Sequence, residues 1–185
     1  MLIDITLRIT PKMATDAQGN ERKAMVGHLG THFDVMDKDF PLEFTRRRGI
    51  VFDVADIGGR DIDIPDIELS KVEGGMFVAF RTGFIESQGY GGKVYFSAHP
   101  QLSNALIDAL LDRNVSIIGV DFAGIRRGGE HTPADQRCAN RGAFVIENFC
   151  NLKAVVEAGG ACVMHTYPMN FAGMTGLPCR VIAEM

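Results

Sequence analysis

The chain has 185 residues, enough for one domain with a hydrophobic core, and its formal net charge of −4 argues against nucleic-acid binding, which needs a basic surface. Hydrophobic residues make up 46% of the chain and charged residues 23%, as in ordinary globular proteins. No apolar run approaches the roughly 20 residues that cross a bilayer, and the N-terminus lacks a signal-peptide pattern. We therefore expect a single cytoplasmic domain over residues 1–185, with neither nucleic-acid nor membrane partners.

The first half of the chain contains short apolar segments that predict strands rather than helices. Residues 1–10 alternate and predict a strand, whereas residues 11–24 are polar and predict a loop or a hairpin. Apolar runs bounded by glycine at 49–53 and 76–80 predict buried strands. Residues 61–68 alternate acidic and apolar side chains, but a proline within them restricts this segment to a sheet edge or a loop.

In the second half, strands and helices are expected to alternate. The clearest helix carries an apolar stripe over residues 106–111, with Ser103 as its N-cap and an end near Asn114. Because alternation of strands and helices favours parallel pairing, we expect an α/β domain with a mixed sheet. The other expected elements are strands at 116–121, 143–147, 161–164 and 180–183, and helices at 133–141 and 150–158.

The segment His28-Leu29-Gly30-Thr31-His32-Phe33-Asp34 brings three metal-binding side chains into seven residues. Two imidazoles and a carboxylate are a ligand set for hydrolytic ions such as zinc or manganese. The glycine within the segment lets the backbone approach an ion or make a strained turn. An isolated His-x-x-x-His pair is more often part of an ordinary polar loop, so the interpretation depends on matches further along the chain.

This segment resembles the motif of the cyclase family, His-x-Gly-Thr-His-x-Asp-x-Pro-x-His, whose best-known members are bacterial kynurenine formamidases and whose relatives include isatin hydrolase. The resemblance continues in order over nearly the whole chain. It implies a swivelling β/β/α fold, a bound divalent metal ion and assembly into homodimers or homotetramers. The further matching segments are Arg81-Thr82-Gly83, His99-Pro100 with Ser103, the run that ends at Asp121, residues 142–148 with Asn151-Leu152, and residues 176–183.

Carried over residue by residue, the resemblance implies a metal site formed by His28, His32, Asp34 and Glu147. A further ligand histidine of the family falls at Asp135, within a preserved Pro-Ala context, so this aspartate would be an oxygen substitute. An additional carboxylate adds negative charge and favours a harder ion such as manganese over zinc. We therefore expect either zinc or manganese as the cofactor.

Two positions depart from the motif, because its proline and its last histidine fall at Met36 and Lys38. That histidine is the family's usual proton-transfer residue, whereas a lysine ammonium at neutral pH cannot accept a proton. Lys38 would instead stabilise developing charge or hold an anion, unless it is simply a solvated lysine in an acidic loop. His131, shortly before Asp135, is the best candidate for a replacement base.

Three residues are expected to contact a small-molecule substrate. Arg81 offers a planar fork of donors to a carbonyl or carboxylate, or else forms a structural salt bridge with Asp53 or Asp121. Phe33 and Phe40 are candidates to line a pocket for a planar molecule, although phenylalanines at such spacing more often belong to a core.

Two functions fit these features. The first is a metal-dependent, arylformamidase-like hydrolase that uses an activated water to cleave the C–N bond of a small amide, N-formyl compound or cyclic amide. The alternative is a catalytically degenerate protein that keeps the fold, binds a metal or a small molecule, and has lost turnover through the changes at Lys38 and Asp135. Assays of turnover would separate the two.

Overall fold

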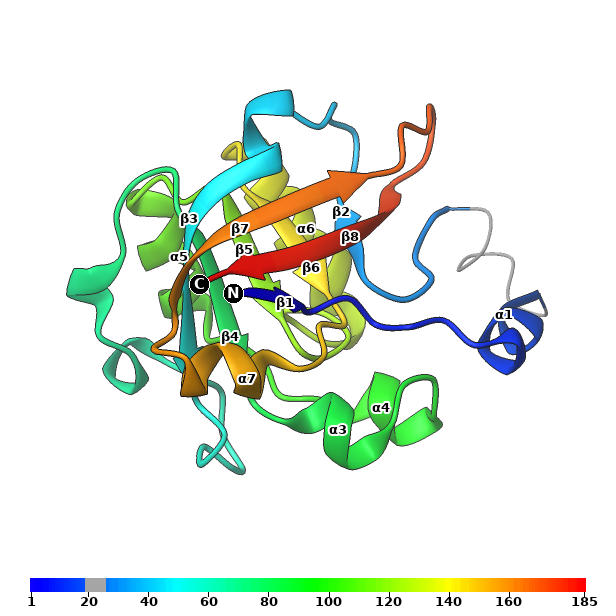
Figure 1. The fold of residues 1–185 in the computed structure, drawn as a ribbon, viewed down its shortest axis with the longest axis horizontal. Helices are drawn as coiled ribbons and strands as arrows, with labels where there is room; N and C mark the ends of the chain where they lie inside the picture. The colour runs from blue at the N-terminus through cyan, green and yellow to red at the C-terminus, as the bar shows by residue number, and fades with distance from the viewer. Residues whose placement is uncertain (19–25) are drawn as a thin grey trace.

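One curved sheet organises the computed structural model, which describes residues 1–18 and 26–185 (Figure 1). Seven strands close into a barrel-like ring in the order β8–β2–β6–β5–β4–β3–β7, because β7 pairs with both β3 and β8. Strand β1 pairs with β8 beside this ring. The strands are β1 (Leu2–Asp4), β2 (His32–Asp34), β3 (Arg46–Asp53), β4 (Phe77–Arg81), β5 (Ile117–Val120), β6 (Phe144–Glu147), β7 (Ala161–Pro168) and β8 (Gly176–Glu184).

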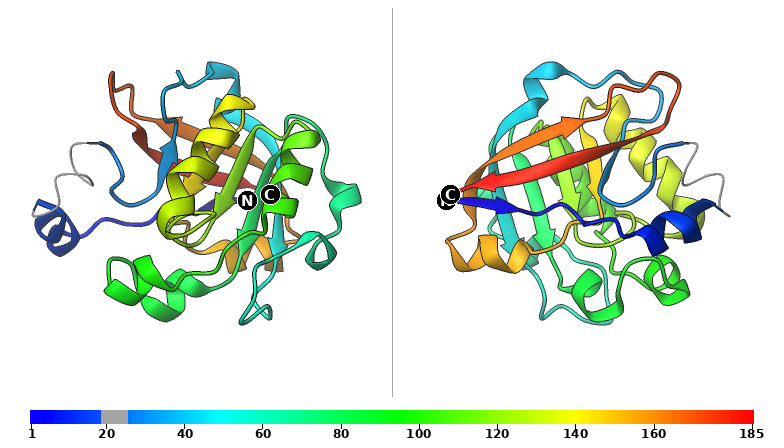
Figure 2. Two further views of the ribbon diagram at one scale, coloured as in Figure 1. Left: turned by 180° about the vertical axis from the view of Figure 1, so that it is seen from behind. Right: turned by 45° about the vertical axis from the view of Figure 1, so that its right-hand side comes forward.

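The sheet is mixed, as the alternation in the sequence predicts. Strands β3, β4, β5 and β6 run parallel, whereas β2, β7 and β8 join their neighbours in antiparallel pairs. The carboxyl ends of the parallel strands therefore meet at one end of the ring. The two chain ends lie side by side, since the Met1 amino group donates to the Met185 carbonyl oxygen at 3.0 Å (Figures 1 and 2).

Helices cover the outside of the ring, with α5 and α6 on the same face of the parallel strands (Figure 2). No helix in the described part of the chain is long and apolar enough to span a bilayer. The helices are α1 (Pro11–Gln18), α3 (Phe84–Gln88), α4 (Lys93–Ser97), α5 (Asn104–Asp112), α6 (His131–Asn140) and α7 (Leu152–Glu157), with 3₁₀ turns at Leu42–Thr45, Ile64–Asp66, Leu69–Lys71 and Gly128–Glu130.

The parallel strands are apolar on both faces because each face contacts its own core. Val145 and Ile118 face outward and pack with the α5 stripe, whereas Phe144 and Ile146 face the ring interior. Side chains that alternate between two buried faces explain why these strands are continuous apolar runs in the sequence. The same alternation decides which residues of β2 can reach α6.

The helix expected from the Ser103 cap to about Asn114 is confirmed as α5, Asn104–Asp112, and the Ser103 hydroxyl oxygen accepts from the Leu106 N–H at 3.0 Å. The first half, however, is not free of helices. Residues 11–18 form α1 instead of a loop, and residues 19–24 of that expectation lie outside the described residues. Helix α1 has few apolar residues, and α3 and α4 span only five residues each, so none shows a clear apolar period.

Several predicted boundaries also shift. The first strand covers Leu2–Asp4, the part of the expected segment 1–10 that lies in ladder register with β8. The last two strands are longer than predicted, since they form a continuous antiparallel pair from Val163↔Glu184 to Pro168↔Cys179. Helix α6 begins at His131 rather than near residue 133, and this earlier start adds a histidine to the helix.

His99 gives the fold a pH dependence that can be measured. It is 1% exposed, its Nδ1 lies 2.7 Å from the Pro100 carbonyl oxygen, and its ring stacks on Phe122. Burial lowers the pKa of His99 from 6.5 to about 4. Between pH 6.5 and 4, His99 is therefore protonated in the unfolded chain but neutral in the folded protein. The free energy of unfolding falls as the pH drops towards 4.

We predict that His99→Gln removes this component of acid sensitivity. The wild type should lose up to about 3 kcal/mol more than the variant when the pH falls from 7.5 to 4, at about 1.4 kcal/mol per pKa unit. Urea unfolding at several pH values measures the difference. Thr166→Val, a control on β7 that removes no titrating group, should keep the wild-type acid loss, and parallel curves for wild type and His99→Gln would contradict the prediction.

Candidate metal centre

Strand β2 presents two predicted ligands on one face. Side chains alternate along a strand, so His32 and Asp34 point towards α6, whereas Phe33 between them points into the ring interior. Gly30, at φ +72°, lies in the turn that leads from His28 into the strand. A three-residue strand therefore brings together the local motif that the sequence shows.

Glu147 joins these residues through the sheet register, because His32 and Glu147 are directly opposite in the antiparallel pair of β2 and β6. Helix α6 supplies His131 and Asp135, whose spacing of four residues puts both side chains on one helix face. Five predicted metal-site residues and the predicted base are thus collected between β2, β6 and α6.

The donor atoms of these six residues lie close together. His28 Nε2 and His32 Nε2 are 3.4 Å and 3.6 Å from Asp34 Oδ1. His32 Nε2 is 3.7 Å from Glu147 Oε2, and His131 Nε2 is 3.0 Å from Glu147 Oε1 and 3.2 Å from Asp135 Oδ2. The donors form two overlapping groups, His28–His32–Asp34 and Asp34–His131–Asp135–Glu147, which share Asp34.

The donor set fits a divalent cation. Ligand atoms about 2.1 Å from a tetrahedral ion lie about 3.4 Å from one another, close to the spacings above. Asp34 Oδ2 and Asp135 Oδ1 are buried and have no hydrogen-bond partner among the described residues, and the buried Glu147 Oε1 faces His131 Nε2. Buried carboxylate oxygens are costly unless they are paired or bind a metal, so these orphan atoms indicate a cation.

Protonation shows the same need for positive charge. Burial alone would lower the pKa of His32, but the charges of Asp34 and Glu147 raise it to about 9. Burial would also lower the pKa of His131, but the contact with Glu147 and the proximity of Asp135 outweigh this effect and raise the pKa to about 10. Burial raises the pKa of Asp135 well above its ordinary value, and the charge of Asp34 raises it further. Three carboxylates here need either protons or a cation to balance them.

Two glycines make room for the histidines at the open side of the cluster. A Cβ at Gly124 would lie 2.8 Å from His131 Cε1, and a Cβ at Gly176 would lie 1.9 Å from His28 Cδ2. The side chains of these two histidines are 35% and 33% exposed, whereas those of His32, Asp34, Asp135 and Glu147 are at most 5% exposed. Solvent therefore reaches the cluster past the two histidines that rest against glycine.

The predicted substrate residues lie elsewhere. Arg81 forms a salt bridge to Asp53 at 2.9 Å, the structural alternative in the sequence analysis. Phe33 is fully buried, with its ring 4.8 Å from that of Phe40, so the structure puts it in the core rather than at a pocket wall. Phe40 packs on the same core but also lines a cavity of about 840 Å³.

Lys38 also lines this larger cavity, and its ammonium lies 2.9 Å from Asp37 rather than in the cluster. A turn closed by the hydrogen bond from Lys38 N–H to the Val35 carbonyl oxygen directs the chain there. Met36 in this turn has φ +57°, which a proline cannot adopt because its ring fixes φ near −65°. The two departures from the family motif therefore belong to one changed turn.

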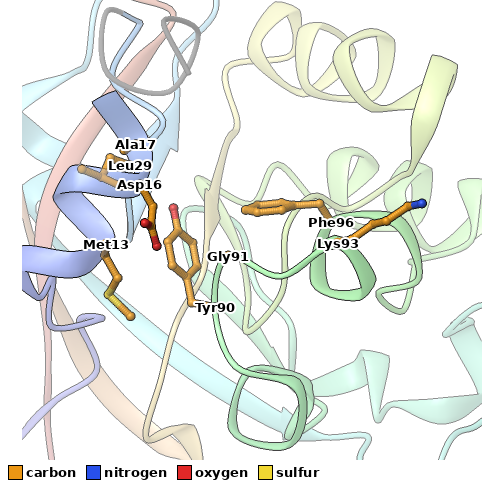
Figure 3. A pocket seen from close by; sticks show the side chains of 8 residues that line it. All are labelled: Met13, Asp16, Ala17, Leu29, Tyr90, Gly91, Lys93 and Phe96. Atoms are coloured by element: carbon orange, nitrogen blue, oxygen red, sulfur yellow. The ribbon is translucent and has the colours of Figure 1, made fainter. Parts of the chain in front are cut away.

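Two cavities lie near the loop at residues 28–31. Thr175 lines the larger cavity, and its hydroxyl lies 3.2 Å from His28 Nε2. A cavity of about 480 Å³ is lined by Leu29, by Met13 and Asp16 of α1, and by Tyr90 (Figure 3). Sequence reasoning gave no role to Thr175, Gly124 or Gly176, because only the tertiary structure brings them to the histidines.

The fold and the site define a mixed α/β protein with a buried cluster of imidazoles and carboxylates suited to a divalent cation. The sequence model of the Cyclase family, described as "Putative cyclase", matches residues 3–126, about two thirds of the chain. The chain therefore belongs to the cyclase family. Among curated proteins, none matches the chain.

Solved structures share the fold at low sequence identity. A protein described as a potential metal-dependent hydrolase with cyclase activity has 21% identity and a TM-score of 0.75, covering 99% of this chain and 96% of its own. A predicted metal-dependent hydrolase from Bacillus stearothermophilus has 20% identity and a TM-score of 0.73, and the match covers 99% of this chain and 97% of that protein. Isatin hydrolase A from Labrenzia aggregata, bound to benzyl benzoate, has 18% identity and a TM-score of 0.74, and the match covers 99% of this chain and 93% of that protein.

Proposed function

We propose that this protein is a metal-dependent hydrolase that cleaves the C–N bond of a small amide, an N-formyl compound or a cyclic amide. One observation carries the proposal: three buried carboxylates, two of them with an oxygen that has no partner among the described residues, face three imidazoles at spacings that suit a shared cation. The names of the similar structures, metal-dependent hydrolases and an isatin hydrolase, support it. Bound zinc or manganese would polarise a carbonyl and make a coordinated water more acidic.

The chain's own residues divide the remaining work. His28, His32, Asp34, Asp135 and Glu147 are proposed as ligands, with Asp34 shared between the two donor groups. We also assign His131 to the ligands, since its Nε2 contacts two of these carboxylates. This assignment changes the sequence-based role of His131 as a base and gives the helix a histidine ligand one turn before Asp135.

The organic part of the substrate is proposed to occupy the larger cavity, next to Thr175 and His28. Phe40 offers an apolar wall there, and Lys38 offers a cation that suits an anionic group. Because Lys38 lies beside Asp37, outside the donor cluster, we assign it to substrate binding rather than to proton transfer. Arg81 is assigned a structural role through its salt bridge to Asp53.

A second candidate function is a binding protein without turnover. The turn at Met36 favours it, because this turn leaves the cluster without the family's proton-transfer residue. Four further properties are predicted from the sequence alone. They are zinc or manganese as the ion, the swivelling β/β/α arrangement, assembly into a homodimer or homotetramer, and a cytoplasmic location.

Turnover tests the main proposal. We predict that wild-type protein loaded with zinc or manganese hydrolyses N-formyl arylamines or cyclic amides and that a chelator stops the reaction. Asp34→Asn should lower kcat/KM by about 10³-fold or more, because it removes a shared ligand, a larger effect than one lost electrostatic donor. Asp112→Asn, on the exposed end of α5, is the control. A metal-loaded wild type that turns over no amide would favour the binding protein.

Metal binding tests the role of His131. We predict that His131→Ala weakens zinc binding by more than the 10- to 100-fold typical of a lost supporting hydrogen bond, measured by chelator competition. His165→Ala, the control, should bind as the wild type does. Wild-type affinity in His131→Ala, combined with turnover that added imidazole restores, would instead identify this residue as the base.

Steady-state kinetics test Lys38. We predict that Lys38→Ala raises KM for a carboxylate-bearing amide by about 10-fold but leaves kcat and metal content unchanged, as expected for binding that is equal in ground and transition states. A neutral amide of the same shape should show little change in KM. A loss of kcat by about 10²- to 10³-fold would show that Lys38 stabilises charge in the transition state.

A further inference from the structure

The peptide of Gly30 is held on both sides, between the two histidines of the motif. Its N–H donates to the Tyr90 hydroxyl oxygen at 2.9 Å. Its carbonyl oxygen accepts from Asn148 Nδ2 at 2.8 Å and lies 2.8 Å from His32 Nδ1. One backbone carbonyl thus connects a proposed ligand to a side chain that follows another proposed ligand, Glu147.

The carbonyl fixes which nitrogen of His32 is available to a cation. A carbonyl oxygen can only accept, so His32 Nδ1 must carry the hydrogen that it shares with Gly30. In the neutral ring, Nε2 then has the free lone pair, and Nε2 is the atom that faces Asp34 and Glu147. A partner on the second ring nitrogen commonly orients a metal-binding histidine.

Asn148 holds the carbonyl in place, and its own orientation is fixed by Tyr95. Because the amide NH₂ must face the Gly30 carbonyl, the amide oxygen faces Tyr95, whose hydroxyl donates to it at 2.7 Å. Both side chains are buried, with Tyr95 fully inaccessible to solvent. The backbone of Asn148 is anchored too, since its carbonyl oxygen accepts from the Thr31 hydroxyl at 2.8 Å.

We propose that Asn148 and Tyr95 are positioning residues for the metal centre, which act through the Gly30 carbonyl to keep His32 Nε2 directed at the cation. The inference rests on the proposed function, since it assumes that the cluster binds a metal ion. It assigns a role to a tyrosine on α4, an element outside the sequence motif. The Tyr95 hydroxyl donates to the amide of Asn148 and not to His32 itself, so removing that hydroxyl should loosen the ligand without removing it.

Two variants test this hydrogen-bond relay, which runs from the Tyr95 hydroxyl through the Asn148 amide to the Gly30 carbonyl and His32. Tyr95→Phe removes one oxygen and keeps the ring contacts to Tyr90, Phe84 and Phe96. Asn148→Gly removes the amide and suits the observed φ of +62°. Thr166→Val is the matched control, because Thr166 is fully buried and its hydroxyl donates to the Phe44 carbonyl oxygen at 3.1 Å, so the variant loses a similar buried hydrogen bond on β7.

The readouts are the Kd for Co²⁺ and the visible absorption spectrum of the Co²⁺-loaded protein, with Tm recorded for each variant. We expect both relay variants to raise Kd by about 10- to 100-fold and to alter the ligand-field bands. Thr166→Val should lower Tm but keep the wild-type Kd and spectrum. Relay variants that only lower Tm, as the control does, would overturn the inference. A wild type that binds no Co²⁺ would overturn the proposed function and the inference together.

Discussion

The short strand β2 is the constraint on which the rest of the structure depends. Its three residues pair with β6 on one side and with β8 on the other, so β2 joins the parallel strands to the antiparallel pair of β7 and β8. Because side chains alternate, the same three residues direct Phe33 into the interior core and the two ligand candidates, His32 and Asp34, towards α6. A slip of one residue in this register would exchange the two faces and bury the ligands in the apolar core.

The same pairing brings buried carboxylates close together, and their negative charges need compensation. It sets Glu147 opposite His32, next to Asp34, and α6 adds Asp135. An unpaired buried charge costs about 3–5 kcal/mol when its partner is removed, so three carboxylates cannot stay ionised here without compensation. The imidazoles of His32 and His131, whose pKa values are raised, supply it when protonated, and a divalent cation would supply it when they are neutral. The cluster is therefore built for exchange between protons and metal ions.

Much of this could be predicted from the sequence where the signal is local. The His-x-x-x-His-x-Asp run, the Ser103 cap and the apolar strands are patterns of adjacent residues, and the structure has them. The ordered family match also named Glu147 and Asp135, which no local pattern would have joined to the motif. These residues meet because of a strand register and a helix face, which depend on the whole fold.

The parts that could not be predicted depend on tertiary contacts or on backbone conformation. Nothing in the sequence indicates that Met36 adopts a positive φ. The position of Lys38 relative to the cluster, which depends on this turn, therefore could not be predicted. The start of α6 at His131 is set by the preceding 3₁₀ turn rather than by Pro133. Gly124 and Gly176 look like ordinary loop glycines until the rings of His131 and His28 are seen against them.

The changed turn and the added helix histidine suggest how one site tolerates two departures from its family. Loss of a histidine at position 135 removes a nitrogen donor, but a histidine four residues earlier on the same helix face reaches the same carboxylates. The motif's last histidine has no such substitute, since the turn at Met36 takes position 38 to the rim of a cavity. In the proposed site, His131 thus takes the place of the nitrogen donor, whereas proton transfer must be supplied from another direction.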